Sequence, residues 1–173
     1  MASPYAMMFA ASAIIIGLGS AFFHASLTLL GQFFDVFGMY LLTSFMLAYA
    51  LKRLLKWTHS RTLVFFVTVN LLLSLALIQV PDTRRYAFAL VLLVAIAVET
   101  LFRRLRKPRV AVRWWNIGFA VFAVGYAIWL LDNTRIVCSP FSALQGHAIW
   151  HIMGAIAVVC LYRYYTSEEF NET

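Results

Sequence analysis

The sequence predicts an all-α, polytopic transmembrane helix bundle with six spans in this chain. Of its 173 residues, 63% are hydrophobic and only 12% are charged, and a water-soluble domain does not have this composition. Apolar runs long enough to cross about 30 Å of hydrocarbon, about 20 residues each, occur six times. The connections are short and carry most of the charge. We therefore expect a single transmembrane domain over residues 1–173 and no separate soluble domain.

The expected spans are the apolar runs between charged or turn-forming residues. They are Tyr5–Leu30, Phe33–Leu51, Thr62–Val80, Tyr86–Phe102, Trp114–Leu131 and Phe141–Tyr164. Gly31 and Gln32 separate the first two spans, and a Pro81–Arg85 turn separates the third from the fourth. Basic segments follow the second and fourth spans. The connection Asp132–Pro140 precedes the last span.

The two basic segments predict how the bundle is oriented. They carry Lys52, Arg53, Lys56 and Arg61, and Arg103, Arg104, Arg106, Lys107, Arg109 and Arg113. Since two spans separate these segments, they lie on one side of the membrane, which the positive-inside rule makes cytoplasmic. Both ends of this chain then fall on that side. We expect a multi-pass protein of the bacterial inner membrane or, in a eukaryote, of the ER or Golgi membrane.

The net charge of +7 is thus explained by topology. Nucleic acid is not an expected partner, because a basic surface with interleaved aromatic residues on a soluble platform is missing.

Ionisable side chains inside the apolar runs indicate a site, because such residues are costly in a bilayer. His147 and His151 are four residues apart and share a helix face, as do Ser20 and His24. With Asp35, all of them fall within about 10 Å of the non-cytoplasmic surface in the predicted topology. This common depth favours a single site close to that surface.

Three imidazoles with an open fourth position are typical of catalytic zinc. The predicted metal ligands are His24, His147 and His151, with Zn²⁺ as the cofactor. Asp35 and Ser20 are the predicted catalytic residues: Asp35 accepts a proton from the attacking water or positions it, and Ser20 donates a hydrogen bond to the water or to the oxyanion.

Several of the polar residues also have structural interpretations. A single membrane histidine is often a helix–helix hydrogen-bond partner, and Ser20 alone is ordinary packing. Glu99 is expected to form a local ion pair with Arg103, one turn away. His59 is expected to be solvated.

Small residues that let helices approach flank the site, at Gly17, Gly19 and Gly146.

The segment from Gly17 to Met39, with His24 and Gln32-Phe-Phe-Asp35, resembles the second and third helices of the alkaline ceramidase family. Gly146-His-Ala-Ile-Trp-His151 is similar to that family's last helix, and Leu131-Asp-Asn with Cys138 resembles the loop before it. The Ser-x3-His, Asp and His-x3-His set is shared with the superfamily that includes the progestin and adipoQ receptors. Only the flanking residues favour ceramidases within it.

The resemblance implies a zinc-dependent membrane amide hydrolase that cleaves ceramide-like N-acyl sphingoid lipids into a fatty acid and a sphingoid base. It matches His24, His147 and His151 to the zinc ligands, and Asp35 and Ser20 to the groups around the attacking water. The family has a seven-helix fold, and this chain begins where the second helix would. The implied first helix follows a short acidic segment associated with calcium.

Two alternatives remain open. The first is a receptor-like or lipid-sensing membrane zinc protein of the same superfamily, and the lack of a soluble signalling domain favours the enzyme. The second is a haem-carrying membrane cytochrome, since membrane histidines also bind iron. Axial histidines of one haem come from facing helices, whereas His147 and His151 share one helix face, which suits one small ion better.

Overall fold

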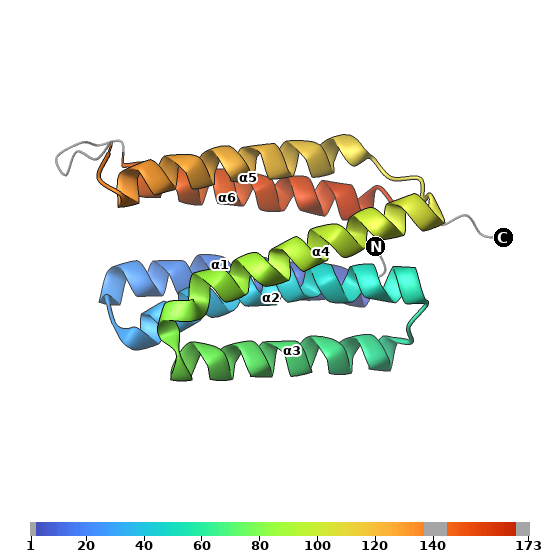
Figure 1. Cartoon of the computed structure of the whole chain (residues 1–173), viewed down its shortest axis with the longest axis horizontal. Coiled ribbons are helices and arrows are strands. Elements are labelled where there is room, and N and C mark those ends of the chain that lie inside the picture. The colour runs from blue at the N-terminus through green and yellow to red at the C-terminus, as the bar shows by residue number, and fades with distance from the viewer. Residues whose placement is uncertain (1–2, 137–144, 169–173) are drawn as a thin grey trace. The chain divides into compact units, whose positions relative to one another are not determined.

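The computed structural model describes residues 3–136 and 145–168, and its regular elements are helices (Figure 1). Six of these helices are long and apolar enough to cross a membrane, which confirms the predicted all-α fold and its six spans. They are α1 (Ser3–Ser26), α2 (Leu29–Leu55), α3 (His59–Gln79), α4 (Arg84–Arg106), α5 (Val112–Asn133) and α6 (Gly146–Thr166), with a short 3₁₀ helix, η1 (Pro81–Thr83), before α4.

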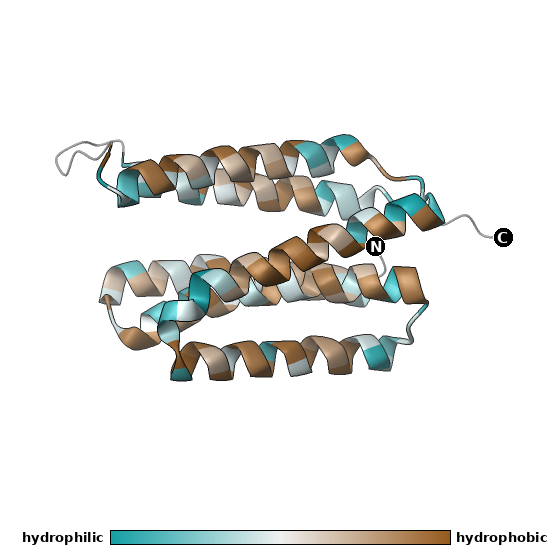
Figure 2. Cartoon of the chain, viewed as in Figure 1, coloured by the Kyte–Doolittle hydropathy of each residue, from teal (hydrophilic) through white to brown (hydrophobic). Residues whose placement is uncertain are grey.

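Apolar side chains cover the outer surface of the helices. Along α3 and α4 the hydrophilic residues gather toward the helix ends and the middle is hydrophobic (Figure 2). On α3 the exposed side chains include Val64, Leu72 and Ile78. An apolar surface of this extent suits contact with lipid and not with water.

The chain forms two compact units, residues 2–107 with α1 to α4 and residues 108–173 with α5 and α6. In the first unit α2 is central and packs against α1, α3 and α4. Its side chains supply much of the unit's core, and Tyr40, Phe45 and Met46 are almost completely buried. The prediction of one domain over residues 1–173 stays a prediction.

Two hydrogen bonds hold α4 beside α2, and the two helices run in the same direction. The Tyr40 hydroxyl, in the first half of α2, donates to the Arg84 carbonyl at the start of α4 over 3.1 Å. At the other end, the Arg106 guanidinium donates to the Leu54 carbonyl over 2.8 Å. The basic C-terminal ends of α2 and α4 therefore lie together at the end of this unit opposite Asp35.

The first connection lies four residues earlier in the chain than expected. We expected the first span to reach Leu30 and the second to begin at Phe33, but α1 ends at Ser26 and α2 begins at Leu29. Leu27 adopts a left-handed conformation, with φ of 51°, and the Thr28 hydroxyl caps α2 by accepting from the Gly31 amide over 3.0 Å. Gly31 and Gln32, expected in a loop, therefore lie in α2.

Other helix ends extend into the charged segments. α2 continues past Leu51 to Leu55, and α4 past Phe102 to Arg106. Half of the ten basic residues expected in these two segments thus occupy the last turns of α2 and α4, where cations interact favourably with the helix dipole. The expected start of the last span, Phe141, lies outside the described residues, within which α6 begins at Gly146.

In the second unit α5 and α6 form an antiparallel pair. A Cβ added to Gly125 would lie 2.9 Å from the Met153 Cβ, so the two helices approach closely at this glycine. At the far end, the Ala111 amide donates to the Ser167 hydroxyl over 2.9 Å. These contacts hold α5 and α6 together at mid-length and where α5 begins and α6 ends.

Candidate metal centre

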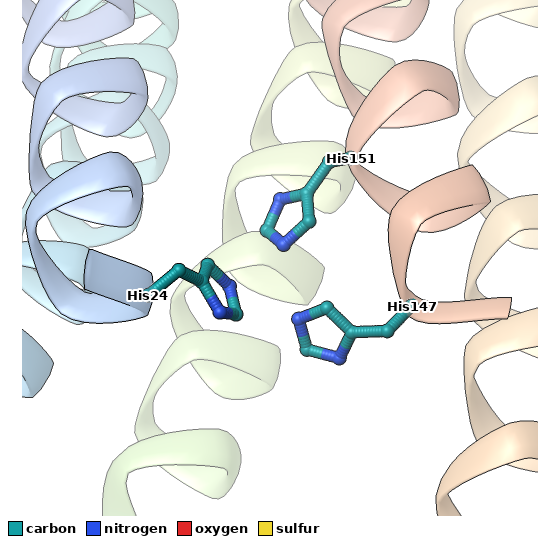
Figure 3. A group of neighbouring side chains, drawn as sticks. All are labelled: His24, His147 and His151. Atoms are coloured by element: carbon teal, nitrogen blue, oxygen red, sulfur yellow. The ribbon is translucent and has the colours of Figure 1, made fainter. Parts of the chain in front are cut away.

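The two histidines of α6 lie side by side. Their ring centroids are 4.8 Å apart, with 57° between the ring planes, and both side chains are partly buried. The four-residue spacing produces this arrangement because positions i and i+4 stack on one face of a helix. His147 and His151 therefore present two imidazoles from one helix face, which suits one small ion (Figure 3).

An aspartate of α5 holds the start of α6. The helix has no side-chain cap from its own N-cap residue, Gln145. Instead, the Asp132 carboxylate accepts a hydrogen bond from the His147 amide over 2.9 Å. Gly146 makes this possible, since an added Cβ would lie 2.7 Å from the Asp132 Cβ. The sequence interpretation did not assign this role to Asp132.

The other predicted site residues lie in the first unit. Ser20 and His24 are one turn apart near the end of α1, Ser20 buried and His24 exposed, while Asp35 is partly buried on α2. Gly19 brings the helices together: an added Cβ would collide with the Phe34 carbonyl and lie 3.0 Å from the Asp35 amide nitrogen. Ser20 therefore lies where α1 meets the backbone of residues 34–35.

Gly17 does not contribute to this approach. A Cβ added there would meet no atom within 4 Å, so the expectation that Gly17 lets helices approach was wrong. Gly19 and Gly146 fulfil that expectation.

Among the described residues, His24 in the first unit and His147 and His151 in the second each offer an imidazole nitrogen that could serve as a ligand to a metal ion. Imidazole nitrogen is a ligand for zinc, copper, iron and nickel alike, so the donor set fits zinc and leaves the identity of the metal open. The assignments of the three ligands and of Asp35 and Ser20 stay proposals.

Two ionisable residues outside this set have partners that the sequence did not indicate. Glu99 of α4 forms a buried ion pair with Arg53 of α2, and the expected pair with Arg103 stays a prediction. His59 is exposed, but it is not simply solvated, since its Nδ1 lies 2.9 Å from the Tyr5 hydroxyl. Both pairs join helices distant in sequence, and helical spacing therefore gave no signal for them.

Of the two cysteines, Cys160 is buried and free on α6. Cys138 lies outside the described residues.

Comparison with known proteins extends these observations. The chain is 28% identical over 172 residues to a protein named alkaline ceramidase from Drosophila melanogaster, with 90% of this chain and 58% of that protein covered. The chain thus spans less than two thirds of that relative. No solved structure matches it. The family model described as Ceramidase matches residues 2–172, and the chain therefore belongs to the Ceramidase family.

Proposed function

We propose that this protein is a zinc-dependent integral-membrane hydrolase that cleaves the amide bond of ceramide-like N-acyl sphingoid lipids. The observation that carries the proposal is the pair of neighbouring imidazoles on α6, His147 and His151, in a chain of the Ceramidase family. The relative named alkaline ceramidase supports the choice of substrate.

In this proposal His24, His147 and His151 bind one zinc ion and leave a position open for reactants. Zinc bound there supplies a Lewis acid that polarises the amide carbonyl and lowers the pKa of water. The chemistry of the donors supports the proposal, because neutral nitrogen ligands on rigid helices match a catalytic zinc site.

Asp35 and Ser20 act on the substrate and the attacking water. The Asp35 carboxylate accepts the proton of that water, since it is the acidic side chain beside the α1–α2 contact at Gly19. The Ser20 hydroxyl donates a hydrogen bond to the amide oxygen as negative charge develops on it. Because Ser20 is only 8% exposed, little water competes for this hydrogen bond.

The substrate is a membrane lipid. Its chains remain among apolar side chains, while the amide reaches the polar residues near one membrane surface. We place that surface on the non-cytoplasmic side, because the basic ends of α2 and α4 are at the opposite end of their unit and the positive-inside rule makes them cytoplasmic.

The test is metal analysis combined with a lipid hydrolysis assay on purified protein in detergent. We expect about one zinc per chain and release of fatty acid from a long-chain ceramide, with both lost in His147→Ala. Full zinc content in His147→Ala would remove the ligand assignment. Zinc binding without hydrolysis of any N-acyl sphingoid lipid would favour the receptor-like or lipid-sensing alternative.

A further inference from the structure

We propose that Asp132 is a positioning residue that increases the affinity of the α6 histidine pair for a metal cation. This inference rests on the proposed metal site. Asp132 lies on α5 and the two imidazoles lie on α6. The contacts that support the inference are all within the α5–α6 unit.

One contribution of Asp132 is geometric. The first amide groups of a helix lack partners within the helix, and at α6 the N-cap residue Gln145 does not supply one from its side chain. The Asp132 carboxylate accepts from the amide of His147 itself. Because an added Cβ on Gly146 would also lie 3.1 Å from the Ile128 carbonyl, the first turn of α6 is packed directly on α5. The backbone that carries His147 is thereby fixed.

The other contribution of Asp132 is electrostatic. The N-terminus of a helix carries a partial positive charge, which opposes the binding of a cation within its first turns. His147 lies in the first turn of α6 and His151 in the second. A carboxylate at this terminus offsets the unfavourable charge. Asp132 therefore supports cation binding by its charge as well as by its hydrogen bond.

The two contributions can be separated by substitution. Asp132→Asn keeps a side-chain carbonyl that can accept from the His147 amide, but removes the charge. Asp132→Glu keeps the charge on a longer side chain, and Asp132→Ala removes both. Asn133→Ala, at the exposed neighbouring position, is the control for a local change at the end of α5.

The measurement is zinc affinity of the full chain in detergent, by titration against a competing chelator, with thermal unfolding and circular dichroism of each metal-free variant. We expect affinity to fall about 10-fold in Asp132→Asn and further in Asp132→Ala, within the range of about 10 to 100-fold found when groups that orient metal ligands are changed. Asp132→Glu should retain more affinity than Asp132→Asn, and Asn133→Ala should match the wild type.

The outcomes distinguish this inference from the proposed function. If the wild type does not bind zinc through His147 and His151, the proposed function fails. If the wild type binds zinc and Asp132→Asn binds it equally well, Asp132 is only a helix cap and this inference is overturned. The inference would also be contradicted if Asp132→Glu lost as much zinc affinity as Asp132→Asn, because the charge would then have no effect.

Discussion

Arg53 and Glu99 form an ion pair between α2 and α4 with side chains only 4% and 1% exposed. The Arg53 guanidinium also lies over the rings of Tyr49 and Phe102, 4.3 and 4.4 Å from their centroids. Its Nε donates to the Tyr49 carbonyl over 3.2 Å. The charge is thus enclosed by hydrogen bonds and aromatic faces, and it links the ends of two helices.

Removing one member of this pair should strongly destabilise the protein. Arg53→Met removes the guanidinium that compensates the buried Glu99 carboxylate, and we expect a loss of about 3 to 5 kcal/mol. Unfolding by denaturant in detergent measures it. Arg104→Gln, an exposed residue near the same end of α4, is the control and should cost less than about 0.5 kcal/mol. The double variant Arg53→Met with Glu99→Leu should recover most of the loss, and failure to recover would show that the pair is not the cause.

Two glycines of α1 should respond in opposite ways to the same substitution. Gly19→Ala places a methyl group against the backbone of Phe34, with the carbonyl carbon 2.6 Å away, and overpacking of this kind costs about 1 to 3 kcal/mol. Gly17→Ala meets open space and should be neutral or stabilising by up to about 1 kcal/mol, since alanine is the better helix former. Thermal unfolding of both variants checks this. Equal effects would contradict the close approach of α1 and α2 at Gly19.

The proposed roles of Asp35 and Ser20 predict different defects. Asp35→Asn keeps the side-chain shape but removes the proton acceptor, so turnover should fall by about 100-fold or more while zinc is retained. Ser20→Ala removes one hydrogen-bond donor and should raise the barrier by about 2 to 4 kcal/mol. Steady-state rates and metal content of each variant are the measurements. Zinc loss in Asp35→Asn together with full activity in Ser20→Ala would make Asp35 a ligand and Ser20 a packing residue.

The proposed lipid substrate predicts a steep dependence on acyl-chain length. Each buried methylene contributes about 0.8 kcal/mol, so shortening the chain by two methylenes should lower kcat/KM by about 15-fold where those methylenes are bound. A series of N-acyl sphingosines in mixed micelles measures this, with His147→Ala as the background. Similar rates for short and long chains would contradict burial of the acyl chain.

The six spans could be predicted because hydropathy and length alone determine which segments cross a bilayer. The ends of the helices could not. α2 begins at Leu29 because the Thr28 hydroxyl caps it, although the adjacent Leu30 reads as a continuation of the preceding apolar run. The charge of Arg53 predicts a loop position, but the residue lies in the last turn of α2. Its partner Glu99 is 46 residues away in sequence, and only the packing of α2 on α4 brings the two side chains together.

Parts of the candidate site follow from local spacing and parts do not. The contact between His147 and His151 is a property of any regular helix with this spacing. The hydrogen bond from the His147 amide to Asp132 depends on how closely α5 approaches α6 at Gly146. That approach is set by glycines and facing side chains on both helices, which no single stretch of sequence reveals.

The turn after α1 bears on how water would reach the site of the proposed hydrolysis. Leu27, Leu29 and Leu30 are all exposed there, while the Leu27 amide donates to the Phe23 carbonyl over 2.7 Å. A turn with apolar side chains and bonded amides tolerates hydrocarbon around it. In the proposed hydrolysis each cleaved amide would consume one water molecule, and beside these leucines the Ser26 and Thr28 hydroxyls bond each other over 3.0 Å. Entry of water past this turn would therefore depend on two paired hydroxyls among apolar side chains, whereas a lipid tail would need no polar group there.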